Sequence, residues 1–156
     1  MSSLRLHVAC VLVAIATVTA CSDDNGTVAS SHPWKGECNL VGNLTNATTL
    51  VVTGTCQLNG LGAAAYLSTQ TLNNTASTFA STTTFTLANG DILRSTNTGS
   101  TAGTANGLTV TGNESAIGGT GQFANATGSA VYTGAVTFTG ATTTSGNITY
   151  DGTLRY

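Results

Sequence analysis

The chain has 156 residues, a formal net charge of −2, and charged side chains at only 6% of its positions. So few lysines and arginines cannot build a basic patch, and the composition therefore argues against a protein that binds nucleic acid. Threonine makes up about a fifth of the chain and glycine is abundant, which favours strands joined by turns. Some disordered chains share this composition, but the regular alternation of apolar and polar residues described below argues against disorder.

The N-terminal segment has the features of a bacterial signal peptide. Arg5 precedes an apolar run over residues 8–18 that is too short to cross a bilayer comfortably. The next residues, VTAC (18–21), resemble the bacterial lipobox, in which an aliphatic residue and two small residues precede a cysteine. We therefore predict a lipoprotein signal peptide over residues 1–20. The alternative is an ordinary secretory signal cut at the same place, with no role for Cys21.

The lipobox resemblance implies that the Cys21 thiol carries a diacylglycerol and that its amino group carries a further acyl chain such as palmitate. Two or more acyl chains hold a protein stably at a membrane without spanning it. Ser22 rather than an aspartate follows the cysteine. By resemblance to the lipoproteins of bacteria with two membranes, this favours the outer membrane, on its periplasmic or surface face, over the inner membrane. We therefore predict a cell-envelope protein whose membrane contact is the lipid on Cys21.

Two further segments complete the predicted organisation. Residues 21–32 are small and polar and are predicted to form a lipidated, flexible tether. The folded part then begins at Pro33-Trp34 and covers residues 33–156. This is about 120 residues, which is enough for one domain with a modest core.

Cys38 and Cys56 are the cysteines that remain once Cys10 leaves with the signal peptide and Cys21 is acylated. An even pair in an exported protein favours a disulfide. A hairpin whose loop is residues 46–48 places the two cysteines opposite each other. The same register pairs, on one face, Leu40 with Gly54, Gly42 with Val52, and Leu44 with Leu50.

A metal site is the alternative use of the two cysteines. It lacks ligands, because His32, beside the tether, is the only histidine after the signal peptide. A Ser–His–Asp triad fails for the same reason, and the chain has no phosphate-binding loop. We therefore predict no metal, no cofactor and no catalytic residue.

Residues 60–72 form a strand pattern whose inward face is ambiguous. Tyr66 and Leu72 share one parity, whereas Leu61 and Leu67 share the other. We expect a β-bulge between the two pairs, since a bulge exchanges the inward and outward faces of a strand.

Residues 82–96 are predicted to form a strand, a turn and a second strand. A loop over residues 89–91 pairs Leu87 with Leu93 and Phe85 with Ser95. Residues 107–112 begin another strand, with Leu108 and Val110 facing inward.

The clearest alternation lies at the C-terminus. In residues 146–156 the apolar face consists of Gly146, Ile148, Tyr150, Gly152, Leu154 and Tyr156. In residues 129–139 the inward face is Ala130, Tyr132, Gly134, Val136 and Phe138, and residues 141–145 make the turn between the two strands. Together with the earlier segments this predicts about eight strands and no helix. Short strands with one polar face predict a single, closed antiparallel β-barrel, which also leaves no exposed edge.

Residues 118–128, GGTGQFANATG, are predicted to form a corner between two strands. The glycines allow tight bends, and Phe123 is the one large apolar side chain available to plug the core. Within strands, Gly54, Gly134 and Gly152 are expected where the barrel wall bends sharply or passes close to a bulky neighbour.

The corner sequence resembles the GGTGxFxxAxG corner of allene oxide cyclase-like and dirigent-like barrels, and of uncharacterised bacterial secreted proteins with that barrel. Weaker matches follow the same order, namely GTCQLNGLG (54–62), ANGDIL (88–93) and the final strand over 146–154. The resemblance covers most of residues 36–156 and implies an eight-stranded antiparallel barrel of calycin-like shape. It implies no activity. The plant members guide reactive intermediates in an apolar cavity, and their polar cavity residues cannot be matched to positions in this chain.

Glu114 is the residue whose placement decides most about function. It shares parity with Leu108 and Val110, so strict alternation turns it inward. Burial would raise its pKa and make it a candidate cavity acid or base. We favour the alternative that a bulge at residues 112–113 turns Glu114 outward.

Tyr66, Tyr132 and Tyr150, together with Glu114, are the candidate ligand-binding residues. The alternative for the tyrosines is a core position with a solvated hydroxyl. We predict a lipid-anchored, non-enzymatic module that binds a small apolar ligand or serves a structural or interaction role. One alternative is an isomerase or cyclase-type enzyme acting on a hydrophobic substrate in the barrel cavity. Another is a Thr/Gly-rich β-solenoid adhesin, which would require a repeat of fixed period.

Overall fold

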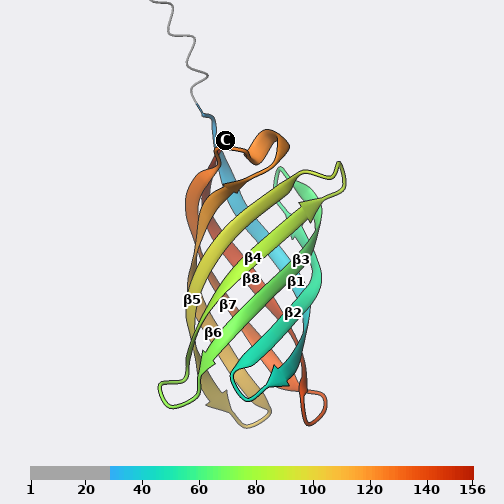
Figure 1. Ribbon diagram of the computed structural model, residues 1–156, viewed down its shortest axis with the longest axis vertical. Coiled ribbons are helices and arrows are strands. Elements are labelled where there is room, and N and C mark those ends of the chain that lie inside the picture. Colours follow the sequence, from blue (N-terminus) through green and yellow to red (C-terminus); the bar gives the residue numbers. More distant parts are fainter. Residues whose placement is uncertain (1–28) are drawn as a thin grey trace, which may run out of the picture.

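The computed structural model describes residues 29–156. They form one closed barrel of eight antiparallel strands, in which each strand pairs with the next along the chain and β8 pairs with β1 (Figure 1). The prediction of an all-β antiparallel barrel is confirmed, and closure of the sheet rules out the β-solenoid. The predicted signal peptide and Cys21 lie outside the described residues. Within residues 29–156, no helix has the length and apolar character needed to cross a membrane.

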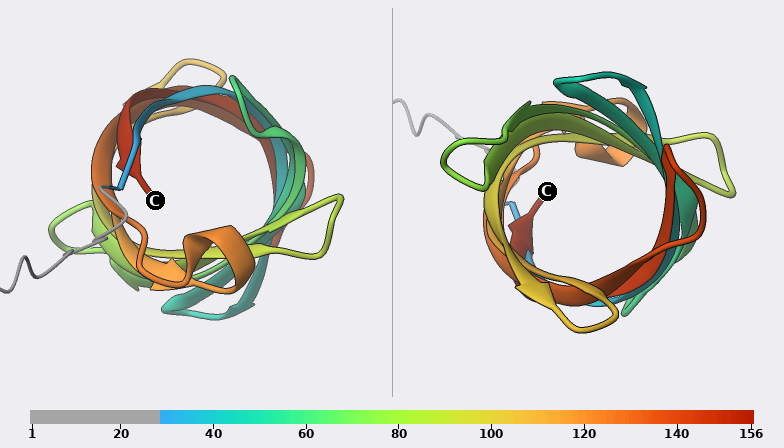
Figure 2. Two further views of the ribbon diagram at one scale, coloured as in Figure 1. Left: turned by 90° about the horizontal axis from the view of Figure 1, so that it is seen from above. Right: turned by 90° about the horizontal axis from the view of Figure 1, so that it is seen from below.

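The strands follow one another in up-and-down order. Their bounds are β1 Ser31–Asn46, β2 Thr49–Leu58, β3 Gly62–Asn73, β4 Thr78–Leu87, β5 Ile92–Thr104, β6 Gly107–Gly119, β7 Thr127–Phe138 and β8 Thr143–Arg155. A single 3-10 turn, η1 (Gly121–Phe123), connects β6 to β7. Seen down the barrel axis, the strands close into a ring and η1 lies at the rim of one end (Figure 2).

The two ends of the barrel are built differently. One end carries η1 and the loops 59–61 and 88–91, and we call it the η1 end. The opposite, far end carries the loops 47–48, 74–77, 105–106 and 139–142. The described chain begins and finishes at the η1 end (Figure 1), where Ser31 of β1 pairs with Arg155 of β8.

β1 begins at Ser31, two residues before the predicted start of the folded part at Pro33. His32 pairs with Leu154 of β8, and its ring stacks on Tyr156 with 4.3 Å between ring centroids. His32 therefore belongs to the barrel wall and not to the tether.

The alternation of side chains in β8 matches the sequence pattern. Ile148, Tyr150 and Leu154 are buried, whereas Thr149 and Asp151 between them are exposed. In β3 the pairing with both neighbours is unbroken, so the bulge predicted within residues 60–72 is wrong. Tyr66 faces the interior and Leu67 is an apolar residue on the outer surface, 49% exposed, an ordinary occurrence in soluble proteins.

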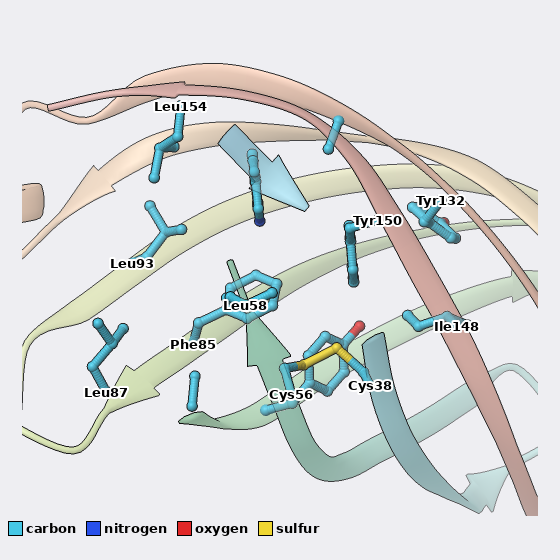
Figure 3. Close-up of a cluster of buried hydrophobic side chains, with 14 of the residues drawn as sticks. Cys38, Cys56, Leu58, Phe85, Leu87, Leu93, Tyr132, Ile148, Tyr150 and Leu154 are labelled. Atoms are coloured by element: carbon cyan, nitrogen blue, oxygen red, sulfur yellow. A yellow bond between two sulfur atoms is a disulfide. The ribbon is translucent and has the colours of Figure 1, made fainter. Parts of the chain in front are cut away.

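The first hairpin has the predicted register. Cys38 faces Cys56, and the two form a disulfide. The other predicted pairs are also present, namely Leu40 with Gly54, Gly42 with Val52 and Leu44 with Leu50. The bond lies in the interior, because both cysteines are fully buried (Figure 3).

Three turns differ from the prediction. Between β1 and β2 the turn is residues 47–48 and not 46–48, with a register shift between Leu44 and Asn46. Between β4 and β5, Leu87 donates its backbone N–H to the carbonyl of Asp91 at 2.9 Å, so the hairpin closes one residue earlier than expected. Phe85 consequently pairs with Leu93, so the predicted pairs of Leu87 with Leu93 and of Phe85 with Ser95 are both wrong. The register changes by an even number of residues, so the same side chains still face inward. Between β7 and β8 the turn is residues 139–142, earlier than the predicted 141–145.

The glycine-rich segment forms a corner, as predicted. Residues 120–126 connect β6 to β7, and Phe123 is fully buried there, with its ring centroid 4.9 Å from that of Tyr156. Gly121 has φ +55°, a conformation that glycine adopts without strain. The Asp91 carboxylate accepts the backbone N–H of Gln122 at 3.3 Å, which joins the corner to the neighbouring hairpin.

The η1 end of the barrel is filled by an apolar core. Its largest fully buried side chains are Trp34, Phe85, Leu93, Phe123 and Leu154. Figure 3 shows Phe85, Leu93 and Leu154 converging in this region, with Tyr132 and Ile148 farther along the barrel. Glycines let neighbouring strands approach, as predicted: a methyl group at Gly134 would lie 2.6 Å from Ile148 Cγ2, and one at Gly152 would lie 2.6 Å from Ala130 Cβ.

Candidate functional site

A layer of buried polar side chains lies below the apolar core. Its members come from β3, β4, β5 and β6 and are Ser68, Ser81, Thr83, Ser95, Asn97 and Glu114. The register of the sheet brings them together, since Ser68 pairs with Thr83, Thr83 pairs with Ser95, and Asn97 pairs with Glu114. Inward side chains on adjacent strands are within reach of one another, so these pairs can hydrogen bond across the interior face.

Sequence reasoning missed all of this polar layer except Glu114. Parity could have found it. Ser81 and Thr83 alternate in step with the inward Phe85 of β4, and Ser95 and Asn97 alternate in step with Leu93 of β5. The signal was overlooked because serine, threonine and asparagine are so frequent in this chain that they read as outward residues.

Glu114 is fully buried, and the bulge that we favoured to turn it outward is wrong. Residues 112–113 keep their pairing with both β5 and β7, and the only register shift between β5 and β6 lies at Leu93 and Ser95, nearer the η1 end. Strict alternation therefore carries through β6 and turns the carboxyl group inward.

Three side chains donate hydrogen bonds to the Glu114 carboxyl group. Ser95 Oγ donates to Oε1, whereas Asn97 Nδ2 and Tyr150 Oη donate to Oε2 at 3.2 and 3.3 Å. Burial raises the pKa of Glu114 from 4.5 to about 7, although these hydrogen bonds oppose part of the increase. The charged side chains of residues 29–156 other than Glu114 lie nearer the η1 end, Asp91 in the loop 88–91 and the others on exposed strand positions, namely Lys35, Glu37, Arg94, Asp151 and Arg155. The buried carboxyl group therefore has hydrogen-bond donors around it but no cation.

The hydrogen bonds continue from Glu114 across the barrel. Asn97 Nδ2 also donates to Thr83 Oγ1 at 3.1 Å, and Thr83 donates to Ser68 Oγ at 3.1 Å. Ser68 in turn donates to Ser81 Oγ at 3.0 Å. On the other side, Tyr132 Oη donates to Asn97 Oδ1 at 3.4 Å. Asn97 is thus the residue through which the carboxyl group, the hydroxyl chain and Tyr132 are connected.

A cavity of about 330 Å³ lies between this polar layer and the far end of the barrel. Its wall is largely apolar and includes Leu44, Leu50, Leu108, Val110, Val136 and Ile148. Residues of the far-end loops, among them Asn74, Ser77 and Thr142, also line it, and Phe138 on the same rim is 64% exposed. An eight-stranded barrel is just wide enough to be filled by side chains or to hold one small ligand, and here the far half is left hollow.

The four predicted ligand-binding residues separate into two pairs. Tyr66 and Tyr132 line the cavity, and with Asn97 they form its floor. Glu114 and Tyr150 lie behind that floor and are not part of the cavity wall. Burial raises the pKa of all three tyrosines above their ordinary value of 10, so their hydroxyl groups stay protonated at neutral pH.

The chain was also compared with models of protein families, with curated proteins and with solved structures. None of them matches. The likeness to allene oxide cyclase-like and dirigent-like barrels therefore stays a prediction from the quoted motifs, and the barrel architecture rests on the strand pairing itself. In the part of the chain that the structure describes, no three histidine, cysteine, aspartate or glutamate side chains gather into a group that could hold a metal ion.

Proposed function

We propose that this protein is a binding module that holds a small apolar molecule in the far half of its barrel. The observation that carries the proposal is the cavity of about 330 Å³ with its apolar wall and its three-residue polar floor. Ligand sites in proteins are typically concave and mostly apolar, with a few polar groups that fix the orientation of the ligand. The exposed Phe138 on the rim adds apolar surface at the mouth.

The position of Glu114 favours a binding role over the cyclase-type alternative. An acid or base in catalysis must come within hydrogen-bond reach of the substrate, directly or through one water. Glu114 is fully buried, and Asn97 lies between its carboxyl group and the cavity. The polar side chains of the cavity floor, Tyr66, Asn97 and Tyr132, carry neutral amide and hydroxyl groups, which suit recognition.

We further propose that the barrel is anchored in the cell envelope through a lipid on Cys21, as the lipobox resemblance implies. Cys21 precedes β1, and β1 begins at the η1 end. An anchor at this position attaches to the chain on the side of the η1 end, opposite the rim of the cavity. The mouth of the cavity then stays accessible to ligands in the surrounding compartment.

A matched pair of substitutions on one strand tests the binding role. Val136 on β7 lines the cavity, whereas Val131 on the same strand is 54% exposed on the outer surface. We expect wild-type protein to bind the neutral dye N-phenyl-1-naphthylamine with an increase in fluorescence. Val136→Trp fills the cavity and should weaken dye binding roughly tenfold or more, because displaced apolar contact is lost. Val131→Trp should leave the affinity within about twofold.

Two outcomes would overturn the binding role. The first is that the wild-type protein does not bind the dye. The second is that Val136→Trp, shown by circular dichroism to be folded, binds the dye as tightly as Val131→Trp does. If Val136→Trp does not fold, Leu108→Phe provides a smaller filling of the same cavity, since Leu108 pairs with Val136 across β6 and β7.

A further inference from the structure

Two residues of the cavity floor, Asn97 and Tyr132, present hydrogen-bond acceptors to a ligand. Asn97 has two amide hydrogens, and both are used, one on Thr83 Oγ1 at 3.1 Å and one on Glu114 Oε2 at 3.2 Å. Its Oδ1 accepts one hydrogen bond, from Tyr132 at 3.4 Å, and an amide oxygen has two lone pairs. One acceptor position on Asn97 is therefore still free.

Tyr132 completes the acceptor set. Its hydroxyl hydrogen is directed to Asn97 Oδ1, and the hydroxyl oxygen keeps its ability to accept. Both residues line the cavity. A ligand group that donates one hydrogen bond to this pair extends an existing chain from Tyr132 through Asn97 to Glu114, and hydrogen bonds in such chains reinforce one another.

The orientation of the Asn97 amide is set by Glu114. The ionised carboxylate can only accept, and its Oε2 receives a hydrogen bond from Tyr150 and one from Asn97, so the nitrogen end of the Asn97 amide points to it. The oxygen end is then left for Tyr132 and the cavity. Glu114 thus determines, from behind the floor, that Asn97 turns an acceptor oxygen toward the cavity.

Charge at the ligand's polar end is disfavoured in this cavity. None of the residues that line it is charged, so an ionised group would be taken out of water without an ion-pair partner. A ligand carboxylate on Asn97 and Tyr132 would in addition face their acceptor oxygens and the Glu114 carboxyl group behind them. An ammonium group would not reach Glu114, because Asn97 lies between them and the carboxyl oxygens are already bonded to three donors.

We propose that the cavity takes a neutral aliphatic alcohol, bound with its hydroxyl group on Tyr132 and Asn97 and its hydrocarbon chain along the apolar wall. This assignment rests on the binding role proposed above and names the ligand class for the same cavity. It also states what the site rejects: an ether of the same length that lacks the donor, the matching carboxylate, and the matching ammonium.

Calorimetric titration of the wild-type protein with four probes of matched length tests the assignment at about pH 7.5. The probes are 1-octanol, 1-methoxyheptane, octanoate and octylammonium. We expect 1-octanol to bind roughly 3- to 10-fold more tightly than the ether, as one added hydrogen bond allows. Octanoate and octylammonium should bind roughly 100-fold more weakly than the alcohol, or not measurably.

The variant Glu114→Gln distinguishes two effects that weaken octanoate binding: repulsion by the Glu114 carboxylate, and the cost of moving any ion from water into an apolar cavity. Because this substitution removes the negative charge without changing the size of the side chain, the affinity of octanoate relative to 1-octanol should rise roughly tenfold. Far-UV circular dichroism confirms that the variant retains the barrel before titration.

The outcomes distinguish this assignment from the binding role itself. If the ether, octanoate or octylammonium binds as tightly as 1-octanol, the cavity is a binding site but the alcohol assignment is wrong. An unchanged ratio in Glu114→Gln refutes the role given to Glu114 in selecting the ligand. If none of the four probes binds and the dye does not bind either, the binding role fails and the alcohol assignment fails with it.

Discussion

Replacing Glu114 with glutamine should change how the stability of the barrel depends on pH. The carboxyl group is fully buried, and burial raises its pKa from 4.5 to about 7 despite donors from Ser95, Asn97 and Tyr150. Each unit by which the pKa of Glu114 differs between the folded and unfolded states corresponds to about 1.4 kcal/mol. Ionisation of this one group therefore lowers the free energy of unfolding by roughly 3 kcal/mol. Glutamine has the same size and carries no charge.

The sign follows from proton binding. Between pH 4.5 and about pH 7 the folded protein holds a proton on Glu114 that the unfolded chain releases. The free energy of unfolding therefore falls as pH rises through this window and levels off above it. In Glu114→Gln this fall is absent. The amide oxygen can accept from Asn97 and Tyr150 while the amide nitrogen donates to Ser95 Oγ, so the variant should match the wild type near pH 4.5.

Urea unfolding of both proteins, followed by circular dichroism at intervals from pH 4.5 to 8, measures the difference directly. We expect the variant and the wild type to agree at the acidic end and the variant to be more stable by roughly 3 kcal/mol at pH 8. Comparing the two proteins cancels the contributions of all other titrating groups. Asp151→Asn is the control, because that carboxyl group is 68% exposed on the outer face, and its replacement should change stability by less than about 0.5 kcal/mol. Parallel curves for Glu114→Gln and wild type would refute the claim that this carboxyl group is buried.

Two further predictions concern the cysteines. The disulfide between Cys38 and Cys56 closes a loop with a sequence separation of 18, so the double variant Cys38→Ala/Cys56→Ala should lose about 3 kcal/mol in urea unfolding; an unchanged midpoint would contradict this. Cys21→Ser, expressed in a bacterium that processes lipoproteins, should move the protein from the detergent phase to the aqueous phase of a Triton X-114 partition, and equal partitioning of variant and wild type would exclude the lipid anchor.

The barrel architecture was predictable because it depends on local alternation, which the sequence displays directly. In the β8 segment apolar residues recur at every second position, and the facing cysteines fixed the register of the first hairpin. The errors in strand pairing arose at turns, where a shift of one residue changes the register, and the two expected bulges, in β3 and in β6, are absent. The turn between β4 and β5 is the example, since the hydrogen bond from Leu87 to Asp91 closes it one residue earlier than predicted. Such turns differ little in energy, so composition alone does not select between them.

The candidate site was predictable only in part. Alternation placed Tyr132 and Tyr150 in the interior and left the face of Tyr66 ambiguous, and all three are buried. It also placed Glu114 there, but we set that placement aside because an isolated buried carboxylate is costly. Hydrogen bonds to the carboxyl group offset part of this cost, and their donors are Ser95, Asn97 and Tyr150. These donors belong to β5 and β8, so the alternation within the Glu114 segment could not reveal them.

By itself, the sequence determined that this chain forms strands with one inward face and one polar face, that a disulfide closes the first hairpin, and that Phe123 is a core residue. These follow from side-chain period, cysteine placement and glycine content, which act over a few residues. Only the tertiary structure decided that the barrel is packed at the η1 end and hollow at the far end, and that Tyr66 and Tyr132 line the hollow while Glu114 and Tyr150 lie behind it. The reason is physical: the volume left inside a closed sheet, and the partners available to a buried polar group, depend on side chains from all eight strands at once.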